Sequence, residues 1–166
     1  MEQIAKTVAD SRAEHCRIIL RGDTNGTGRL FGGRLVEWID MVAGVVARRH
    51  SSCNVTTASI DELSFIEAAH ADDTVVLIGK IAYVGRTSME VRVDTFVERL
   101  DGEKLQVNRA YLTLVALDWA DRPAEVPRLL LSTDEERAEW EAGAERARER
   151  KRRRSEAAKK GAPAEG

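Results

Sequence analysis

Four residues in the first quarter of this 166-residue chain have groups that could take part in acid–base or nucleophilic chemistry. Asp40 is the candidate general base or nucleophile, because a carboxylate can activate water or attack a carbonyl directly. Asn25 carries both a donor and an acceptor, so it could orient that water or hold the substrate. Gly32 and Gly33 precede a long apolar run, and unpaired N–H groups at a helix start stabilise developing negative charge. Together these groups could supply a base, a hydrogen-bonding group and an anion site.

Each of these residues also has a plain structural interpretation. Asp40 could form a salt bridge with Arg48 or with a residue of a partner subunit. Asn25 could form an Asx turn within the glycine-rich loop at residues 22–28. The two glycines could simply make a tight loop-to-helix turn, although their lack of Cβ atoms would also let a substrate oxygen approach the backbone. A phosphate-cradling loop is disfavoured, because no Gly-Lys-Ser/Thr sequence follows them.

A helix is needed to position Asp40. Steps of 100° from Leu35 place a broad apolar arc on one side of a helix that runs from about residue 31 to residue 49. Asp40 stands at the edge of the remaining polar sector, where partial burial makes a carboxylate more basic. Glu37 lies in the same sector and could either perturb Asp40 or be a solvated helix residue. A helix this apolar belongs inside a fold rather than on its surface.

Strands should surround that helix. A short β-prone run precedes it at residues 16–20, and longer runs follow it at residues 54–66, 74–84, 88–98 and 105–117. Asp101 and Gly102 predict a hairpin with a type I′ turn, which needs positive φ. The short connections imply an antiparallel sheet. Thr133 and Glu136 form a capping box that opens a C-terminal helix ending near residue 154.

This order of elements predicts an α+β protein with the hotdog fold, in which an antiparallel β-sheet wraps around one long central helix and a C-terminal helix is exposed. We expect a lead-in at residues 1–14, the hotdog domain at 15–131, the C-terminal helix at 132–154 and a disordered tail at 155–166. A half-wrapped helix leaves one face for a partner subunit, so we expect at least a homodimer.

Composition limits the class of protein. With 43% hydrophobic and 33% charged residues the chain is typical of soluble globular proteins, and no stretch approaches the ~20 apolar residues that a membrane span needs. The N-terminus lacks the apolar segment of a signal peptide. The two cysteines fit a reducing cytosol, and the three histidines are scattered, so we expect a cytoplasmic protein with no metal site.

Charge is concentrated near the C-terminus. Residues 146–160 contain nine Lys or Arg against Glu149 and Glu156, a balance of 9 − 2 = +7, which leaves −2 − 7 = −9 for the rest of the chain. Such a tail could bind nucleic acid or a membrane surface. No aromatic residue follows Trp140, however, and the tail has no apolar face. We therefore expect a solvated helix end and neither a nucleic-acid nor a membrane partner.

The segment at residues 22–40 resembles the hotdog acyl-CoA thioesterases of the YciA and brain acyl-CoA hydrolase type. Their signature is D-x-N, two residues, G, then FGG and an Asp seven residues after the second of those glycines (40 − 33 = 7). The chain fills these positions with Asp23, Asn25, Gly28, Phe31, Gly32, Gly33 and Asp40. A second segment, residues 84–88, is similar to the family's strand end that contacts CoA. Residues 64–68 depart from the family pattern, which leaves the preferred acyl chain length open.

The resemblance implies an acyl-CoA thioesterase that hydrolyses fatty acyl-CoA to free acid and CoA, with no cofactor besides the CoA of the substrate. It implies that Arg86 binds a phosphate of CoA and that Thr87 and Ser88 contact the pantetheine or pyrophosphate, although the same segment could be only a β-hairpin turn. In the family, the Asn and the Asp of one site come from different subunits, and dimers often assemble into trimers of dimers.

Two other functions fit the same fold. A hotdog dehydratase needs a catalytic His, often on the central helix, but no His precedes His50 there and Val45 stands five residues beyond Asp40. A non-catalytic acyl-CoA-binding sensor or scaffold would keep the pocket without the reaction. The presence of both Asn25 and Asp40 disfavours that alternative.

Overall fold

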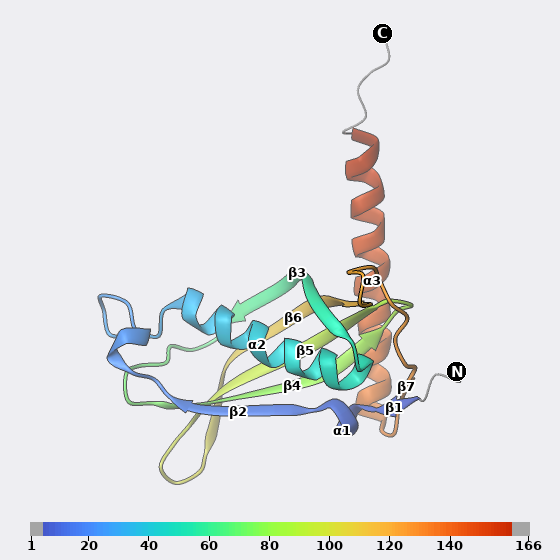
Figure 1. Ribbon diagram of the computed structural model, residues 1–166. Coiled ribbons are helices and arrows are strands. Elements are labelled where there is room, and N and C mark those ends of the chain that lie inside the picture. The colour runs from blue at the N-terminus through green and yellow to red at the C-terminus, as the bar shows by residue number, and fades with distance from the viewer. Residues whose placement is uncertain (1–4, 161–166) are drawn as a thin grey trace.

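The computed structural model describes residues 5–160 and confirms the hotdog arrangement: a five-stranded antiparallel sheet curls around helix α2, Gly32–Ser51 (Figure 1). The strands lie in the order β2-β4-β5-β6-β3. Their bounds are β2 Ala13–Ile18, β3 Asn54–Phe65, β4 Thr74–Val84, β5 Ser88–Glu98 and β6 Lys104–Leu117. A 3-10 turn, η1, spans Arg21–Asp23. The strand boundaries after the helix follow the sequence patterns closely, whereas β2 begins at Ala13 rather than near Cys16.

Helix α2 is buried as its apolar arc predicts. Its residues Leu35, Trp38, Ile39, Val42, Ala43, Val46 and Ala47 lie in the core. The helix approaches the sheet most closely at Gly79 of β4, where a Cβ atom would come within 2.8 Å of methyl groups of Val42 and Val46. The helix ends at Ser51, followed by Ser52 in the left-handed conformation at φ 57°.

The β5–β6 hairpin forms at Asp101 and Gly102, but the turn type differs from the expected one. Only Gly102 has positive φ, at 87°, and its N–H donates to Arg99 O, so the loop is longer than a two-residue type I′ turn. The sequence therefore predicted the position of the hairpin but not the type of its turn.

Strand β3 forms an edge of the sheet. It pairs with β6 alone, and no other strand within residues 5–160 contacts its free edge. Ile60 and Phe65 on this strand are exposed apolar side chains. A long edge strand with unpaired backbone groups is a template for pairing with another chain.

Residues 6–11, which we expected to be a lead-in, form structure of their own. Strand β1, Lys6–Thr7, pairs in parallel with β7, Leu129–Leu130. Helix α1, Val8–Ser11, buries Val8 and Ser11 and begins with a capping box between Thr7 and Asp10. Capping and burial of a single turn fix this segment.

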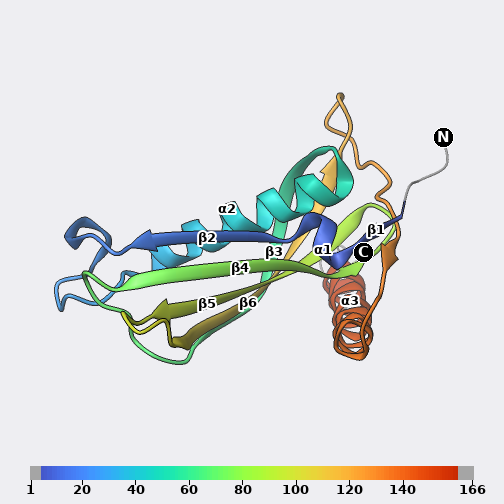
Figure 2. The ribbon, with the colours of Figure 1, turned by 90° about the horizontal axis from the view of Figure 1, so that it is seen from below.

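Helix α3, Asp134–Lys160, lies on the face of the sheet opposite α2 (Figure 2). Its predicted capping box is confirmed, since Glu136 N donates to Thr133 Oγ1 at 3.1 Å. The Trp140 ring packs on Tyr83 with a centroid distance of 5.2 Å. The helix continues beyond the expected end at residue 154, where Arg152 pairs with Glu156 of the next turn at 3.8 Å. The part of the expected tail at residues 161–166 lies outside the described residues.

Ionic contacts hold α3 to the sheet, which the sequence did not indicate. Glu90 of β5 is fully buried and accepts hydrogen bonds from Arg146 at 2.7 Å and Arg150 at 2.6 Å. Glu139 of α3 pairs with Arg92 of β5 at 2.6 Å.

None of the helices within residues 5–160 is long and apolar enough to span a membrane.

Candidate active site

Asp40 lies on the side of α2 that faces strand β3. Thr57 Oγ1 of β3 donates a hydrogen bond of 2.6 Å to Asp40 Oδ1. The alternative salt bridge to Arg48 is absent: Arg48 Nη2 instead donates to Asn54 Oδ1 at 3.1 Å. Asp40 therefore has a fixed orientation and no cation within salt-bridge distance among the described residues. Glu37, one turn earlier, pairs with Arg34 at 2.6 Å and is solvated.

Asp40 and Thr57 line a groove of about 540 Å³ between α2 and β3. The other lining residues are Met41, Gly44, Val45, Arg48, Val55 and Leu114. The carboxylate is half-buried, so one oxygen is held by Thr57 while the groove gives access to the other.

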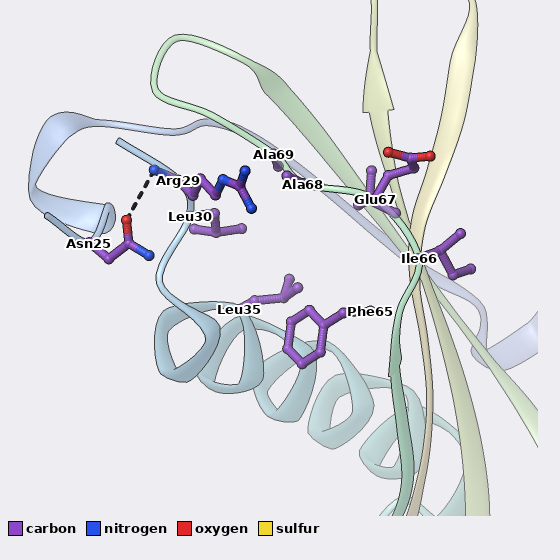
Figure 3. A pocket seen from close by; sticks show the side chains of 10 residues that line it. Asn25, Arg29, Leu30, Leu35, Phe65, Ile66, Glu67, Ala68 and Ala69 are labelled. Carbon is purple, nitrogen blue, oxygen red and sulfur yellow. Dashed lines mark hydrogen bonds between the residues drawn. The ribbon is translucent and has the colours of Figure 1, made fainter. Parts of the chain in front are cut away.

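Asn25 makes the Asx turn considered as its structural role. Its Oδ1 accepts from Thr27 N at 3.0 Å and from Thr27 Oγ1 at 2.7 Å. It also accepts from Arg29 N at 3.2 Å (Figure 3). These bonds occupy only the carbonyl end of the amide. No acceptor within residues 5–160 bonds to Asn25 Nδ2, so the NH₂ group is free to donate to a ligand. The structural and the functional roles are thus compatible.

Asp23 connects the Asn25 loop to the start of α2. Its carbonyl oxygen accepts from Phe31 N at 2.9 Å, and its carboxylate accepts from Leu20 N at 3.0 Å. Arg34 Nε lies 3.3 Å from the same carboxylate. A largely buried acid held in this way explains why an Asp two residues before Asn25 belongs to the motif.

A second cavity of about 440 Å³ lies beside the Asn25 loop and the first turn of α2. Its walls come from Asn25, Arg29, Leu30, Leu35, Phe65, Ile66, Glu67, Ala68, Ala69 and Val107 (Figure 3). Apolar side chains dominate the part near Leu35 and Phe65, which suits a hydrocarbon chain. Most of residues 64–68, where the sequence departs from the family pattern, therefore line this cavity.

Gly32 and Gly33 form the first turn of α2, as expected. Phe31 precedes them without a side-chain cap, and within residues 5–160 no backbone acceptor takes either glycine N–H. A Cβ on Gly33 would lie 2.7 Å from the Phe31 ring, and one on Gly32 would lie 3.5 Å from the Phe65 ring. Two unpaired donors at a helix N-terminus can bind an oxyanion.

One copy of the chain does not bring these groups together. Gly32 and Asp40 are separated by 40 − 32 = 8 residues of helix, or about 12 Å at 1.5 Å per residue. Asn25 and Asp40 line different cavities that share no residue. Within one copy the carboxylate therefore lies apart from both the amide and the helix N–H groups.

Arg86 and Thr87 lie in the β4–β5 connection and Ser88 is the first residue of β5, so the hairpin-turn alternative describes the backbone of this segment. Gly85 N donates to Ser88 O at 2.8 Å, and the Arg86 side chain is 82% exposed with Glu125 at 3.7 Å. Thr87 O accepts from Ala116 N near the end of β6. The segment thus lies at the end of the sheet where α2 ends, away from the Asn25 loop.

Thr57 is the one contact of Asp40 that sequence reasoning missed. It lies 17 residues after Asp40, in a β-prone run without a motif. Only the pairing of β3 with β6, Thr57 opposite Leu114, and the packing of α2 on that face bring the hydroxyl to the carboxylate. No local pattern in the sequence carried this signal.

Comparisons with known proteins agree with this geometry. The family model of the thioesterase superfamily matches residues 27–102. The uncharacterized acyl-CoA thioester hydrolase YkhA of Bacillus subtilis is 39% identical over 132 residues, which cover 79% of this chain and 77% of that protein. The human cytosolic acyl coenzyme A thioester hydrolase is 28% identical over 82% of this chain, which spans only 37% of that protein.

Solved structures give the same result. An acyl-CoA hydrolase from Staphylococcus aureus, in complex with butyryl coenzyme A and coenzyme A, has a TM-score of 0.89 and 30% identity over 95% of this chain and 96% of its own. A hexameric acyl-CoA thioesterase has a TM-score of 0.86 and 37% identity over 90% of this chain and 96% of its own. Structures of the Staphylococcus aureus enzyme include variants in which an aspartate, an asparagine or a threonine is replaced by alanine.

Proposed function

This chain belongs to the thioesterase superfamily, as a hotdog-fold acyl-CoA thioester hydrolase, and from that premise we propose how its residues carry out the reaction. It hydrolyses fatty acyl-CoA to the free acid and CoA. Asp40 is the general base or nucleophile, and the N–H groups of Gly32 and Gly33 stabilise the oxyanion. Asn25 orients the water or the thioester. Mammalian relatives are named cytosolic, and we assign this chain to the cytoplasm on the same basis.

The hydrogen bond between Thr57 and Asp40 is the observation that carries this proposal. It fixes Oδ1 of the carboxylate and leaves Oδ2 to act. The intervals along the chain between the three residues replaced in the Staphylococcus aureus enzyme equal the intervals between Asn25, Asp40 and Thr57 here. The same three residue types at the same spacing support the same kind of site in both proteins.

As a general base, Asp40 Oδ2 takes a proton from water while the water oxygen attacks the thioester carbonyl carbon. The carbonyl oxygen becomes an oxyanion at the helix N-terminus. When the C–S bond breaks, the CoA thiolate takes up the proton that Asp40 holds. If Asp40 attacks directly, the intermediate is a mixed anhydride that water then opens. Single-turnover hydrolysis in ¹⁸O-labelled water identifies direct attack when the label enters the Asp40 carboxylate, because water then opens the anhydride at the Asp40 carboxyl carbon.

The site is formed between two copies of the chain. Asn25, Gly32 and Gly33 of one copy act with Asp40 and Thr57 of the other, because the two groups lie too far apart within one copy. The free edge of β3 offers backbone groups and exposed apolar side chains for pairing with a second copy. A homodimer is therefore the smallest active unit. Hexameric relatives make a trimer of dimers the expected assembly.

The deciding experiment measures free-thiol release from short-, medium- and long-chain acyl-CoA substrates by wild type and by Asp40→Asn. The variant keeps the size of the side chain and removes its basicity. We expect kcat to fall about 10²- to 10⁴-fold, the range for loss of a general base. Normal turnover by a folded Asp40→Asn protein would contradict the mechanism. A wild-type protein that binds acyl-CoA but releases no thiol would instead support the sensor alternative.

A further inference from the structure

We propose that helix α3 positions the reacting carboxylate through Asp61 of β3, which Arg150 of α3 holds in place. Asp61 is a positioning residue: it fixes the stretch of β3 that presents Thr57 to Asp40. The inference rests on the proposed function, because it concerns the orientation of the group that reacts. Helices α2 and α3 lie on opposite faces of the sheet (Figure 2), so β3 would connect the C-terminal helix to the central one.

The course of β3 is the first observation. Side chains of a regular strand alternate between the two faces of a sheet, so Thr57 and Asp61, 61 − 57 = 4 residues apart, would point the same way. The pairing of β3 with β6 shifts twice in this stretch, between Thr57 and Ser59 and between Ile60 and Glu62. Irregularities of this kind re-aim side chains. Thr57 consequently reaches α2, whereas Asp61 reaches α3.

The bonds of Asp61 are the second observation. Its Oδ2 accepts from Arg150 Nη1 at 3.1 Å and from Thr113 Oγ1 of β6 at 2.8 Å. Its Oδ1 accepts from Ser59 Oγ at 2.8 Å. The side chains of Arg150 and Asp61 are each 17% exposed, so water screens this pair less than a surface ion pair. These bonds hold β3 to a helix and to the next strand at the place where its regular pairing is interrupted.

Arg150 is itself anchored, which is the third observation. The same Nη1 donates to Oε2 of the fully buried Glu90 at 2.6 Å. Arg146, one turn earlier, also bonds to Glu90, at 2.7 Å, but none of its bonds within residues 5–160 goes to β3. Among the described residues of the basic run at 146–160, Arg150 is therefore the one that bonds to the edge strand. This contact gives part of the run a role within the chain.

A double-mutant cycle on the hydrolysis of butyryl-CoA tests the proposal. Asp61→Asn keeps the size of the side chain and removes the charge that Arg150 binds. Displacement of a reacting group slows the chemical step, so we expect kcat to fall about fivefold with KM within about twofold of wild type. In a Thr57→Val background the same change should lower kcat less than about twofold, because the contact through which Asp61 acts is already absent.

Two results of the cycle overturn the proposal. One is a wild-type kcat in the single variant Asp61→Asn. The other is a double variant whose loss of kcat equals the product of the two single losses, because independent sites behave in that way. Arg150→Gln perturbs the same pair from α3 and should show the same dependence on Thr57, whereas Arg150→Lys keeps the charge and should retain most of the rate.

Arg146→Ala is the matched control for a general effect of α3. It removes a partner of Glu90 and no bond to β3, so the folded variant should keep kcat within about twofold of wild type. An equal loss of kcat in Arg146→Ala and Asp61→Asn would assign the effect to the packing of α3 and overturn the proposal.

Hydrogen–deuterium exchange gives a readout that needs no turnover. Amides of residues 55–63 should exchange faster in Asp61→Asn than in wild type, while those of β4 keep their rates, because only the local opening of β3 becomes easier. Unchanged exchange in residues 55–63 overturns the proposal. A wild type that releases no thiol contradicts the proposed function and with it the link to Asp40. Faster exchange with a wild-type kcat contradicts only the link from Asp61 to the reaction.

Discussion

Thr57 and Asp40 join the edge strand β3 to the central helix α2 through a hydrogen bond of 2.6 Å. Strand β3 is also the edge at which we expect a second copy to pair. Orientation of the carboxylate is therefore tied to the strand that forms the proposed dimer interface. Any shift of β3 relative to α2 would move Asp40 Oδ1 away from its donor.

Replacing Thr57 by valine should slow the reaction without unfolding the protein. Valine keeps the shape of threonine and removes the O–H donor. A hydrogen bond to a charged group contributes about 1.5–3 kcal/mol, so we expect kcat/KM for acyl-CoA to fall about 10- to 100-fold. Thr57→Ser should recover most of the rate. Thr56→Val is the neighbouring control, and a loss of rate there equal to that of Thr57→Val would show a general effect on β3.

Mixing two inactive variants should restore activity. If each site takes Asn25 from one copy and Asp40 from the other, a mixed dimer of Asn25→Ala and Asp40→Ala contains one intact site. Random exchange of equal amounts makes about a quarter of all sites intact, so thiol release should approach that fraction of the wild-type rate. No recovery, after exchange of labelled subunits has been demonstrated, would place both residues of a site in one chain.

Arg146→Ala should destabilise the fold by about 3 kcal/mol, because it removes a main partner of the fully buried Glu90. Urea unfolding of wild type and variant measures the change. Arg152→Ala, on the exposed part of the same helix, should change the free energy of unfolding by less than about 0.5 kcal/mol. A chain truncated at Glu145 should behave like Arg146→Ala or worse, since Arg150 is also lost. Equal stability of all four proteins would show that α3 contributes little.

His50 should make stability depend on pH below neutrality. The imidazole is fully buried, with Nε2 at 3.0 Å from Pro127 O, and burial lowers its pKa below the ordinary value although the Pro127 bond and Asp10 oppose this. Lys6 also lowers it. The unfolded chain therefore binds the proton more readily than the folded chain. The free energy of unfolding should be unaffected by His50 above about pH 6.5 and should decrease as pH falls below that value.

Urea unfolding between pH 5 and pH 8 measures this dependence, which can reach about 1.4 kcal/mol per pH unit. His50→Gln keeps an N–H donor for Pro127 O and cannot take up the proton. Its curve should be flatter than that of wild type in the acidic part of the range. Parallel curves for the two proteins would assign the dependence to other groups.

The sequence by itself determined the elements and the composition of the site. The 3.6-residue period of the apolar residues around Leu35 located α2, and alternation located the strands, because a period reports which side of a local element is buried. The spacing from Asn25 through Gly33 to Asp40 indicated the family. The position of Asp40 beside the apolar arc also follows from the sequence of one helix, and in the structure Asp40 lies there, half-buried.

Tertiary structure decided which groups meet. Asp40 bonds to Thr57 rather than Arg48 because β3 follows β6 at the edge of the sheet, and that order is a non-local property. Helix α3 is held to the sheet by ion pairs with Glu90. The burial of Glu90 results from the packing of α3 on the face of the sheet opposite α2, and the alternation of residues in β5 does not predict it. The separation of Gly32 from Asp40 likewise follows from the length of the helix that contains both residues. The period of the apolar residues shows which side of a helix or strand is buried. Only the packing of distant segments determines which residues contact that side.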